Sequence, residues 1–188
     1  DLAGFCVGVV EKEAIIDGST IVAGDAVIGL ASSGAHSNGY SLIRRLVELA
    51  RASDRTELEG QLLFDRLLTP TRIYVKSMLA LARTLQVRGF AHITGGGLTD
   101  NIPRVLPRGL EVLLQRAAWH RGPLFDWMQQ VGHIGDAEMH RTFNCGIGMV
   151  AIVPRDQASA AIAQLLASGE RATLIGTVRE GNGGVSIQ

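Results

Sequence analysis

The sequence has little cysteine, no excess of either charge and no long apolar run, and each absence excludes a class of protein. Its two cysteines, Cys6 and Cys145, lack the CxxC spacing of a zinc site. They fit a reduced, cytoplasmic protein better than a disulfide-stabilised one. The 18 basic and 18 acidic side chains cancel and form no basic run, so nucleic acid is not an expected partner.

No apolar run approaches the length that crosses a bilayer, so we expect no membrane partner. The chain opens on Asp1 without the basic start of a signal peptide. Its first segment, DLAGFCVGVVEK, has the pattern of a buried strand over residues 2–10 that has already begun. We therefore expect this sequence to be a fragment whose N-terminal part is absent.

Strand and helix patterns alternate along the chain without internal repeats. Short apolar runs next to glycine predict further strands at residues 26–31, 87–94, 111–115, 145–153, 172–178 and 184–188. Amphipathic periodicity predicts helices at residues 38–50, 70–85, 122–132, 137–141 and 157–169, with a loop at 53–60 and a short helix that Pro107 ends. Because several strands follow hairpin-like turns, we predict an α+β fold: a mixed β-sheet covered by helices.

Two segments share one design: SSGAHSNGY, residues 32–40, and HITGGGLTDN, residues 92–101. In each, a strand enters a turn rich in glycine, serine or threonine that opens a helix. Unpaired N–H groups and a partial positive charge at a helix start favour a phosphate, and glycine lets the backbone approach it. We expect Gly95, Gly96 and Gly97 to bind substrate, with Ser37 as the helix N-cap and Asn38 reaching the ligand.

The alternative is that these turns are only tight connections. Glycine-rich turns between a strand and a helix occur in many α/β proteins without a ligand. Neither segment has the spacing of a P-loop or of a dinucleotide-binding fingerprint. The presence of two such turns, each with a histidine, favours a binding function modestly.

Histidine is the usual proton carrier near neutral pH, and His36 and His92 stand at the two turns. We take both as candidate catalytic residues, the alternative being histidines that cap a loop carbonyl. The three other histidines, His120, His133 and His140, are predicted to lie on the surface. No histidine pair has the spacing of a zinc site, so no metal ligand is assigned.

Three further polar residues are candidates for substrate binding. Asn101 and Arg104 are three apart and would share one face of the short helix, where the arginine could bind a phosphate or carboxylate. The alternative for Arg104 is a surface salt bridge. Asn144 precedes Gly146 and Gly148, whose missing side chains indicate close approach either of a ligand or of another strand.

Five stretches, taken together, resemble a known family. DLAGFCVG, SSGAHSNGYSLIR, PTRIYVKS, HITGGGLTDNIPRVLP and RTFNCGIGMV are similar to the C-terminal half of phosphoribosylformylglycinamidine cyclo-ligases, also called AIR synthetases, in the family's order. The resemblance implies the PurM-like fold. It also implies that residues 1–12 are the last strand of an N-terminal ATP-binding domain and that residues 13–188 form the C-terminal, substrate-side domain. Relatives with the same plan include formylglycinamidine synthetase, selenophosphate synthetase and thiamine-phosphate kinase.

The resemblance also implies an activity in purine biosynthesis: formylglycinamidine ribonucleotide and ATP give aminoimidazole ribonucleotide, ADP and phosphate. It implies ATP and Mg²⁺ as cofactors, bound mainly by the N-terminal domain, and a homodimer in the complete enzyme. This chain lacks the family's DGVGTK-like nucleotide loop, so we expect it to be inactive alone. The alternatives are a non-catalytic phosphoribosyl-binding module and a related ATP-dependent synthetase.

Overall fold

The computed structural model describes residues 4–188, and within them six strands form one mixed sheet. The strand order is β4-β6-β1-β7-β5-β8, and only the β5–β8 pair is parallel. The strands are β1 Ala26–Ala31, β4 Gly89–His92, β5 Leu110–Leu114, β6 Ile147–Val153, β7 Ala172–Glu180 and β8 Val185–Ile187. The mixed, mostly antiparallel sheet confirms the predicted α+β class.

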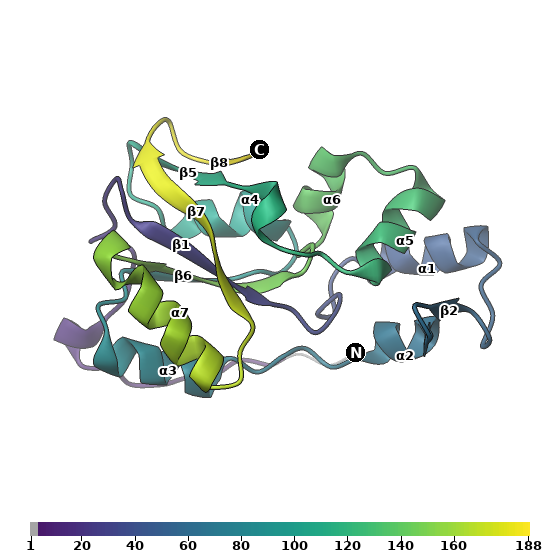
Figure 1. Ribbon diagram of the computed structural model, residues 1–188, viewed down its shortest axis with the longest axis horizontal. Helices are drawn as coiled ribbons and strands as arrows, with labels where there is room; N and C mark the ends of the chain where they lie inside the picture. The colour runs from purple at the N-terminus through teal and green to yellow at the C-terminus, as the bar shows by residue number, and fades with distance from the viewer. Residues whose placement is uncertain (1–3) are drawn as a thin grey trace.

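Helices cover both faces of the sheet (Figure 1). On one face lie α3 (Val75–Thr84) and α7 (Ala158–Ala167), whose buried residues pack with Ile28 and Leu30 of β1. On the other lie α4 (Gly97–Asn101) and the 3-10 turn η2 (Ile102–Val105), which pack with Val27. Successive residues of β1 therefore enter opposite cores, as the two-residue period of a strand requires.

The remaining helices form a bundle beside the sheet, at the right of Figure 1. It contains α1 (Tyr40–Leu49), α2 (Leu63–Leu68), α5 (Pro123–Gly132), α6 (Asp136–Thr142) and the hairpin β2 (Glu57–Leu58)–β3 (Gln61–Leu62). The bundle has its own core, in which Phe125 and Phe143 meet edge to face with ring centroids 6.2 Å apart. Three 3-10 turns complete the described structure: η1 (Lys12–Ala14), η3 (Arg116–Ala118) and η4 (Arg155–Gln157).

One edge of the sheet gathers the loops that matter for function. Because β1 and β4 both pair antiparallel with β6, they run parallel to each other and end beside the start of β6. The start of β7 lies at this edge too, since Ala172 pairs with Leu30. We name this the loop edge; it comprises residues 32–39, 93–96, 115–122, 144–146 and 169–171.

Two local predictions were wrong, for different reasons. The helix expected from Pro70 begins only at Val75. Residues 70–74 lie outside the helix, where the Tyr74 hydroxyl donates to the Ala31 carbonyl at 2.7 Å and Arg72 pairs with buried Glu170 at 2.6 Å. The hairpin β2–β3 and helix α2 were missed, because segments of two and six residues carry little periodicity of their own.

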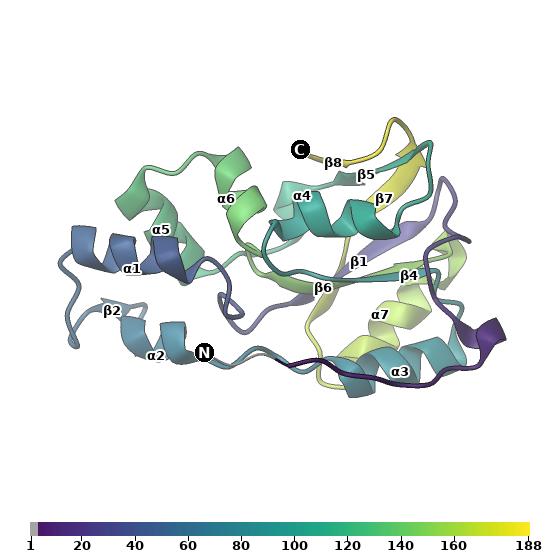
Figure 2. The same cartoon turned by 180° about the vertical axis from the view of Figure 1, so that it is seen from behind.

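The strand expected at residues 2–10 is also absent over the described part, Gly4–Val10, while residues 2 and 3 lie outside it. Phe5 is 95% exposed and Val9 fully exposed, so these apolar side chains contact almost nothing. Figure 2 shows the segment before β1 running past α3. The chain joins the body at Gly18, where a side chain would overlap the Val105 carbonyl. None of the helices in residues 4–188 is long and apolar enough to cross a membrane.

The two cysteines should differ sharply in reactivity. Cys6 is exposed, whereas Cys145 is buried, and burial raises the pKa of the Cys145 thiol to about 12. Because the thiolate is the reactive form, a thiol reagent at pH 8 should label one group at once and the second only after denaturation. The measurement is an absorbance time course in buffer and in urea. A Cys6→Ser variant should lose the fast phase, and two equally fast phases in the native wild type would contradict the burial of Cys145.

Candidate functional site

Three turns meet at the loop edge and are joined by hydrogen bonds: the first is residues 32–39, the second 93–96 and the third 144–146. The N–H of Ser32 donates to the Gly146 carbonyl at 2.8 Å, and the N–H of Ile93 donates to the Gly148 carbonyl at 2.9 Å. A side chain at Gly95 would lie 3.7 Å from the Asn38 amide oxygen. The structure therefore brings together the two glycine turns that the sequence analysis selected, although their histidines are 56 positions apart in the sequence.

His36 lies inside the first turn, not on its surface. It is 3% exposed, and its Nε2 accepts the Ser33 N–H at 2.9 Å. The Ser33 hydroxyl, also close to Nε2, donates to the Pro70 carbonyl at 2.7 Å. Since a backbone N–H can only donate, Nε2 carries a lone pair and the ring proton is on Nδ1.

The surroundings keep this imidazole neutral. Its Nδ1 is buried and has no hydrogen-bond partner among the described residues. A side chain at Gly148 would overlap the His36 ring and the Tyr74 hydroxyl, so glycine is required for this close packing. Burial first, and then the proximity of His92 and Arg72, lowers the pKa of His36 to about 4.

Positive backbone φ angles shape the first turn beyond His36. His36 and Ser37 have φ of 53° and 59°, in the left-handed region that side chains seldom adopt. The expectation that Ser37 caps the helix was wrong: Gly39 is the N-cap of α1 and no side chain caps that helix. Ser37 is instead exposed, and Asn38 donates from its amide nitrogen to the His36 carbonyl at 2.7 Å.

The second turn is stabilised by Asn101. This side chain is 4% exposed and donates to the carbonyls of Gly95 at 3.2 Å and Gly97 at 2.7 Å. Its amide oxygen accepts the Thr94 hydroxyl at 3.1 Å. These bonds direct the Asn101 side chain into the loop. It therefore fixes the loop's shape and does not present a free amide to solvent.

The three glycines of this turn have different surroundings. Gly96 is the N-cap of α4 with φ of 97°, and Gly97, with φ of 59°, packs against the His140 carbonyl so closely that a side chain would overlap it. Gly95 is exposed, and only the Asn38 side chain comes near the position of a Cβ. Gly97 therefore serves packing, whereas Gly95 leaves its backbone open to solvent.

His92 and Arg104 are both exposed. His92 closes β4, and its ring centroid lies 6.5 Å from that of Tyr74, which itself lies 6.1 Å from that of His36. Arg104, in η2, forms no ion pair within residues 4–188. Of the two candidate catalytic histidines, His92 is the one whose ring is accessible.

Asn144 links the third turn to the first. Its buried amide nitrogen donates to the Gly34 carbonyl at 2.8 Å, and its oxygen accepts the Gly146 N–H at 2.9 Å. The space beside Gly146 and Gly148 is therefore filled by other residues of the same chain and not by a ligand. Asn144 is buried and joins the first and third turns through these two hydrogen bonds.

His140 was expected on the surface and is instead 5% exposed. Its Nδ1 lies 2.9 Å from the Asp136 carbonyl, its Nε2 has no partner among the described residues, and burial lowers its pKa. The ring meets Trp119 edge to face with centroids 6.4 Å apart. Sequence reasoning missed it because the residue lies on the inner face of α6, a helix too short to show that face.

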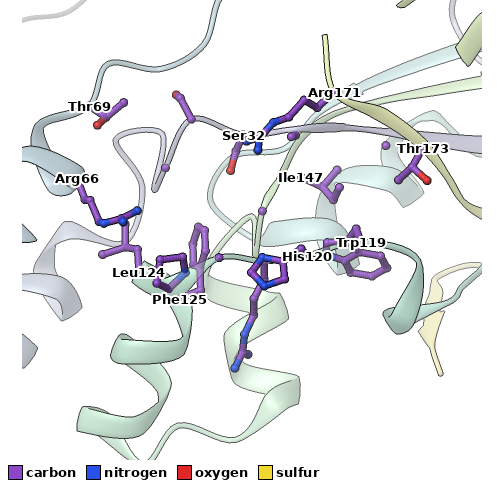
Figure 3. Close-up of a pocket in the computed structure, with 18 of the residues that line it drawn as sticks. Ser32, Arg66, Thr69, Trp119, His120, Leu124, Phe125, Ile147, Arg171 and Thr173 are labelled. Carbon is purple, nitrogen blue, oxygen red and sulfur yellow. The ribbon is translucent and has the colours of Figure 1, made fainter. Parts of the chain in front are cut away.

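A cavity of about 780 Å³ opens on the other side of the first turn (Figure 3). Ser32, Ser33 and Gly34 form part of its wall, together with residues 118–125 and the start of β7. Arg66 and Arg171 point into it from α2 and from the residue before β7. Neither sequence motif predicted this cavity, because its walls come from segments that are far apart in the sequence, from Gly29 to Thr173.

The described residues contain no cluster of three or more His, Cys, Asp or Glu side chains that could hold a metal ion. The donors present at or next to the loop edge are backbone N–H groups, hydroxyls, amides, arginines and two exposed histidines, His92 and His120. This set suits an anionic organic molecule better than a bare cation.

Comparison with known proteins agrees with this architecture. Residues 22–188 match the family model described as "AIR synthase related protein, C-terminal domain". The chain belongs to this family. A protein of Cupriavidus pinatubonensis is 58% identical over 180 residues, and one of Burkholderia vietnamiensis is 60% identical over 179. Both are named phosphoribosylformylglycinamidine cyclo-ligase, and the matches cover 96% and 95% of this chain but 51% of each relative. The chain thus spans about half the length of these curated relatives.

Solved structures share the fold at low sequence identity. Escherichia coli HypE, a hydrogenase maturation protein, superposes with a TM-score of 0.60 at 20% identity, covering 90% of this chain and 48% of HypE. Thiamine-monophosphate kinase of Stenotrophomonas maltophilia gives 0.62 at 15% identity, covering 95% and 54%. These likenesses establish the PurM-like fold and nothing about the ligand.

The buried state of His36 predicts a specific pH dependence. Its pKa of about 4 lies below the value near 6.5 of an unfolded histidine, so between these pH values the unfolded chain binds more protons. Stability should therefore fall as the pH drops from about 6.5 to 4. Urea unfolding across this range should show a steeper pH dependence for the wild type than for His36→Gln. An NMR titration in which the His36 ring changes charge near pH 6.5 would contradict the burial argument.

The glycine turn predicts a contrast between two alanine substitutions. Gly97→Ala should lower the free energy of unfolding by more than about 2 kcal/mol, because its Cβ would overlap the His140 carbonyl and the backbone would have to shift. Gly95→Ala, the matched control in the same loop, should cost less than about 1 kcal/mol because its position is open. Urea denaturation of both variants measures the difference. Equal losses would mean that the loop is not packed on α6 as described.

Proposed function

We propose that this chain is the substrate-side domain, residues 13–188, of an ATP-dependent cyclo-ligase of purine biosynthesis. The enzyme would close formylglycinamidine ribonucleotide to aminoimidazole ribonucleotide and release ADP and phosphate, in the cytoplasm. The observation that carries this proposal is 58–60% identity, over nearly the whole chain, to relatives named for that reaction. The convergence of both glycine turns at the loop edge supports it independently of the names.

The reaction requires a site that binds anions and moves a proton. An amide oxygen is a poor leaving group, so ATP phosphorylates it, the amidine nitrogen attacks the activated carbon, and phosphate departs. We assign substrate contact to the open backbone at Gly95 and to Ser37 and Asn38 of the first turn. We also assign it to Arg104, an exposed residue of η2 that lies outside both turns. Gly96 starts α4 within the second turn and completes its wall.

The two histidines divide into different roles under this proposal. His92 is exposed at the end of β4, so we assign to it proton transfer or stabilisation of developing charge. His36 keeps its Nε2 on the Ser33 N–H, so we assign to it the positioning of the first turn. Asn101 and Asn144 have the same positioning role, since their amides bond within and between the turns.

ATP and Mg²⁺ are the cofactors that the reaction uses. Without a cluster of metal donors in residues 4–188, we propose that the other half of the complete enzyme binds both, and that the complete enzyme is a homodimer. A solved relative supports nucleotide use in structures of this fold: PurL of Thermotoga maritima was crystallised with AMPPCP. On this view the chain alone binds substrate weakly and does not complete the reaction.

The test compares this chain alone with a hybrid in which it replaces the corresponding half of the C. pinatubonensis relative. ADP release dependent on formylglycinamidine ribonucleotide should appear in the hybrid and be absent from the chain alone. In the hybrid, His92→Ala should lower kcat at least about tenfold and change KM less, because the group acts on the reacting atoms more than on ground-state binding.

A matched control is available in His133, an exposed histidine after α5 that is remote from both turns in sequence. Its left-handed backbone, with φ of 47°, is tolerated by asparagine, so His133→Asn should leave kcat and KM unchanged. Unchanged kinetics in His92→Ala across the pH range would remove this residue from the mechanism. A folded hybrid that binds substrate but never releases ADP would favour the non-catalytic binding module.

A further inference from the structure

We propose that the 780 Å³ cavity beside the first turn is a second binding site, which takes a small phosphate ester such as a sugar phosphate. The cavity is of the size that holds small organic ligands, and it is far larger than inorganic phosphate needs. Its wall includes none of the substrate contacts assigned above. The inference rests on the cavity's own residues and does not depend on the proposed reaction.

Two arginines give the cavity its preference for anions. Arg171 is exposed, makes no ion pair or side-chain hydrogen bond within residues 4–188, and points toward Ser32 (Figure 3). Arg66 is held by bonds from Nε and one terminal nitrogen to the Leu58 carbonyl, at 3.2 and 2.8 Å. Its other terminal nitrogen remains available for a ligand. A guanidinium fixed in this way is a preorganised donor for phosphate.

Ser32 supplies a polar group that the protein itself does not use. The residue is 8% exposed, its backbone N–H bonds to Gly146, and its hydroxyl has no hydrogen-bond partner in the described chain. Figure 3 shows this hydroxyl directed into the cavity, near the end of the Arg171 side chain. A hydroxyl on a mostly buried residue at the cavity wall, without a protein partner, is suited to bonding a ligand.

The start of α5 adds further donors. This helix has ten residues, Gly122 is its N-cap, and no side chain caps it. Gly122, Pro123 and Leu124 line the cavity, so the free N–H of Leu124 and the positive end of the helix dipole lie at its wall. Proline at the first helical position removes no needed donor, because that N–H has no helical partner.

The balance of charge and the apolar wall define the class of ligand. Glu59 is the one carboxylate residue lining the cavity, whereas Arg66, Arg121 and Arg171 all line it. Arg121 is neutralised by Asp126, at 2.5 Å, so the unbalanced charge lies with Arg66 and Arg171. Apolar side chains such as Phe125 and Ile147 provide a surface for the uncharged part of a phosphate ester.

The experiment titrates the 188-residue chain with ribose 5-phosphate, inorganic phosphate and ribose while recording amide NMR shifts. Ribose 5-phosphate should shift the amides of Ser32 and Leu124 and bind several-fold more tightly than inorganic phosphate, and ribose should cause no shift. Arg171→Ala should raise the Kd for ribose 5-phosphate at least about tenfold, the effect of losing one charge-assisted contact. Ser32→Ala should raise it less.

Arg155→Ala is the matched control, because Arg155 is an exposed arginine on η4, outside the cavity. It should leave the Kd within about twofold of the wild type, since an exposed charge acts weakly through solvent. An Arg171→Ala variant with wild-type affinity would overturn the proposal, as would shifts confined to residues 95–97. Equal affinity for inorganic phosphate and ribose 5-phosphate would overturn the claim that the cavity holds the organic part.

Discussion

The position of β6 between β1 and β4 is the constraint on which the rest of the loop edge depends. A strand that pairs antiparallel with both neighbours forces those neighbours to run the same way, so their ends meet at one edge. Two turns that are distant in sequence therefore become neighbours without a ligand to bring them together. The hydrogen bonds from Ser32 and Ile93 to the first residues of the β6 segment extend this pairing into the turns themselves.

The cost of the arrangement is a set of buried polar groups that the protein must satisfy internally. A buried polar atom without a partner loses the hydrogen bonds it would make in water. Asn101 and Asn144 have bonded amides, and the His36 Nε2 accepts a backbone N–H. The exception is the His36 Nδ1, enclosed beside Gly148, whose desolvation keeps the ring neutral. His36, Asn101 and Asn144, which the sequence alone presents as candidate ligand-binding groups, therefore serve to stabilise the turns.

Sequence patterns predicted the α+β class and most elements, because β6, α1 and α7 have clear two-residue or helical periods and glycine or proline at their ends. They also selected the two turns that the sheet brings together. They failed where tertiary contacts decide the outcome, at the non-helical segment before Val75 and at the inward ring of His140. They also failed at Gly4–Val10, which is exposed and forms no strand. The cavity could not have been predicted, since Arg66, Ser32, Leu124 and Arg171 share no local motif.

Residue type alone could not separate structural from functional groups at this edge, but the hydrogen-bonding pattern does. A side chain whose donors and acceptors are all engaged by the protein has nothing to offer a ligand, so its substitution acts through the fold. Groups left open at the same edge, namely the Gly95 N–H, the His92 ring, the Ser32 hydroxyl and the Arg171 guanidinium, have no such internal use in the described chain. They fall into two sets on opposite sides of the first turn. His36 and Asn144 hold the first turn between these two sets, through the Ser33 N–H and the Gly34 carbonyl.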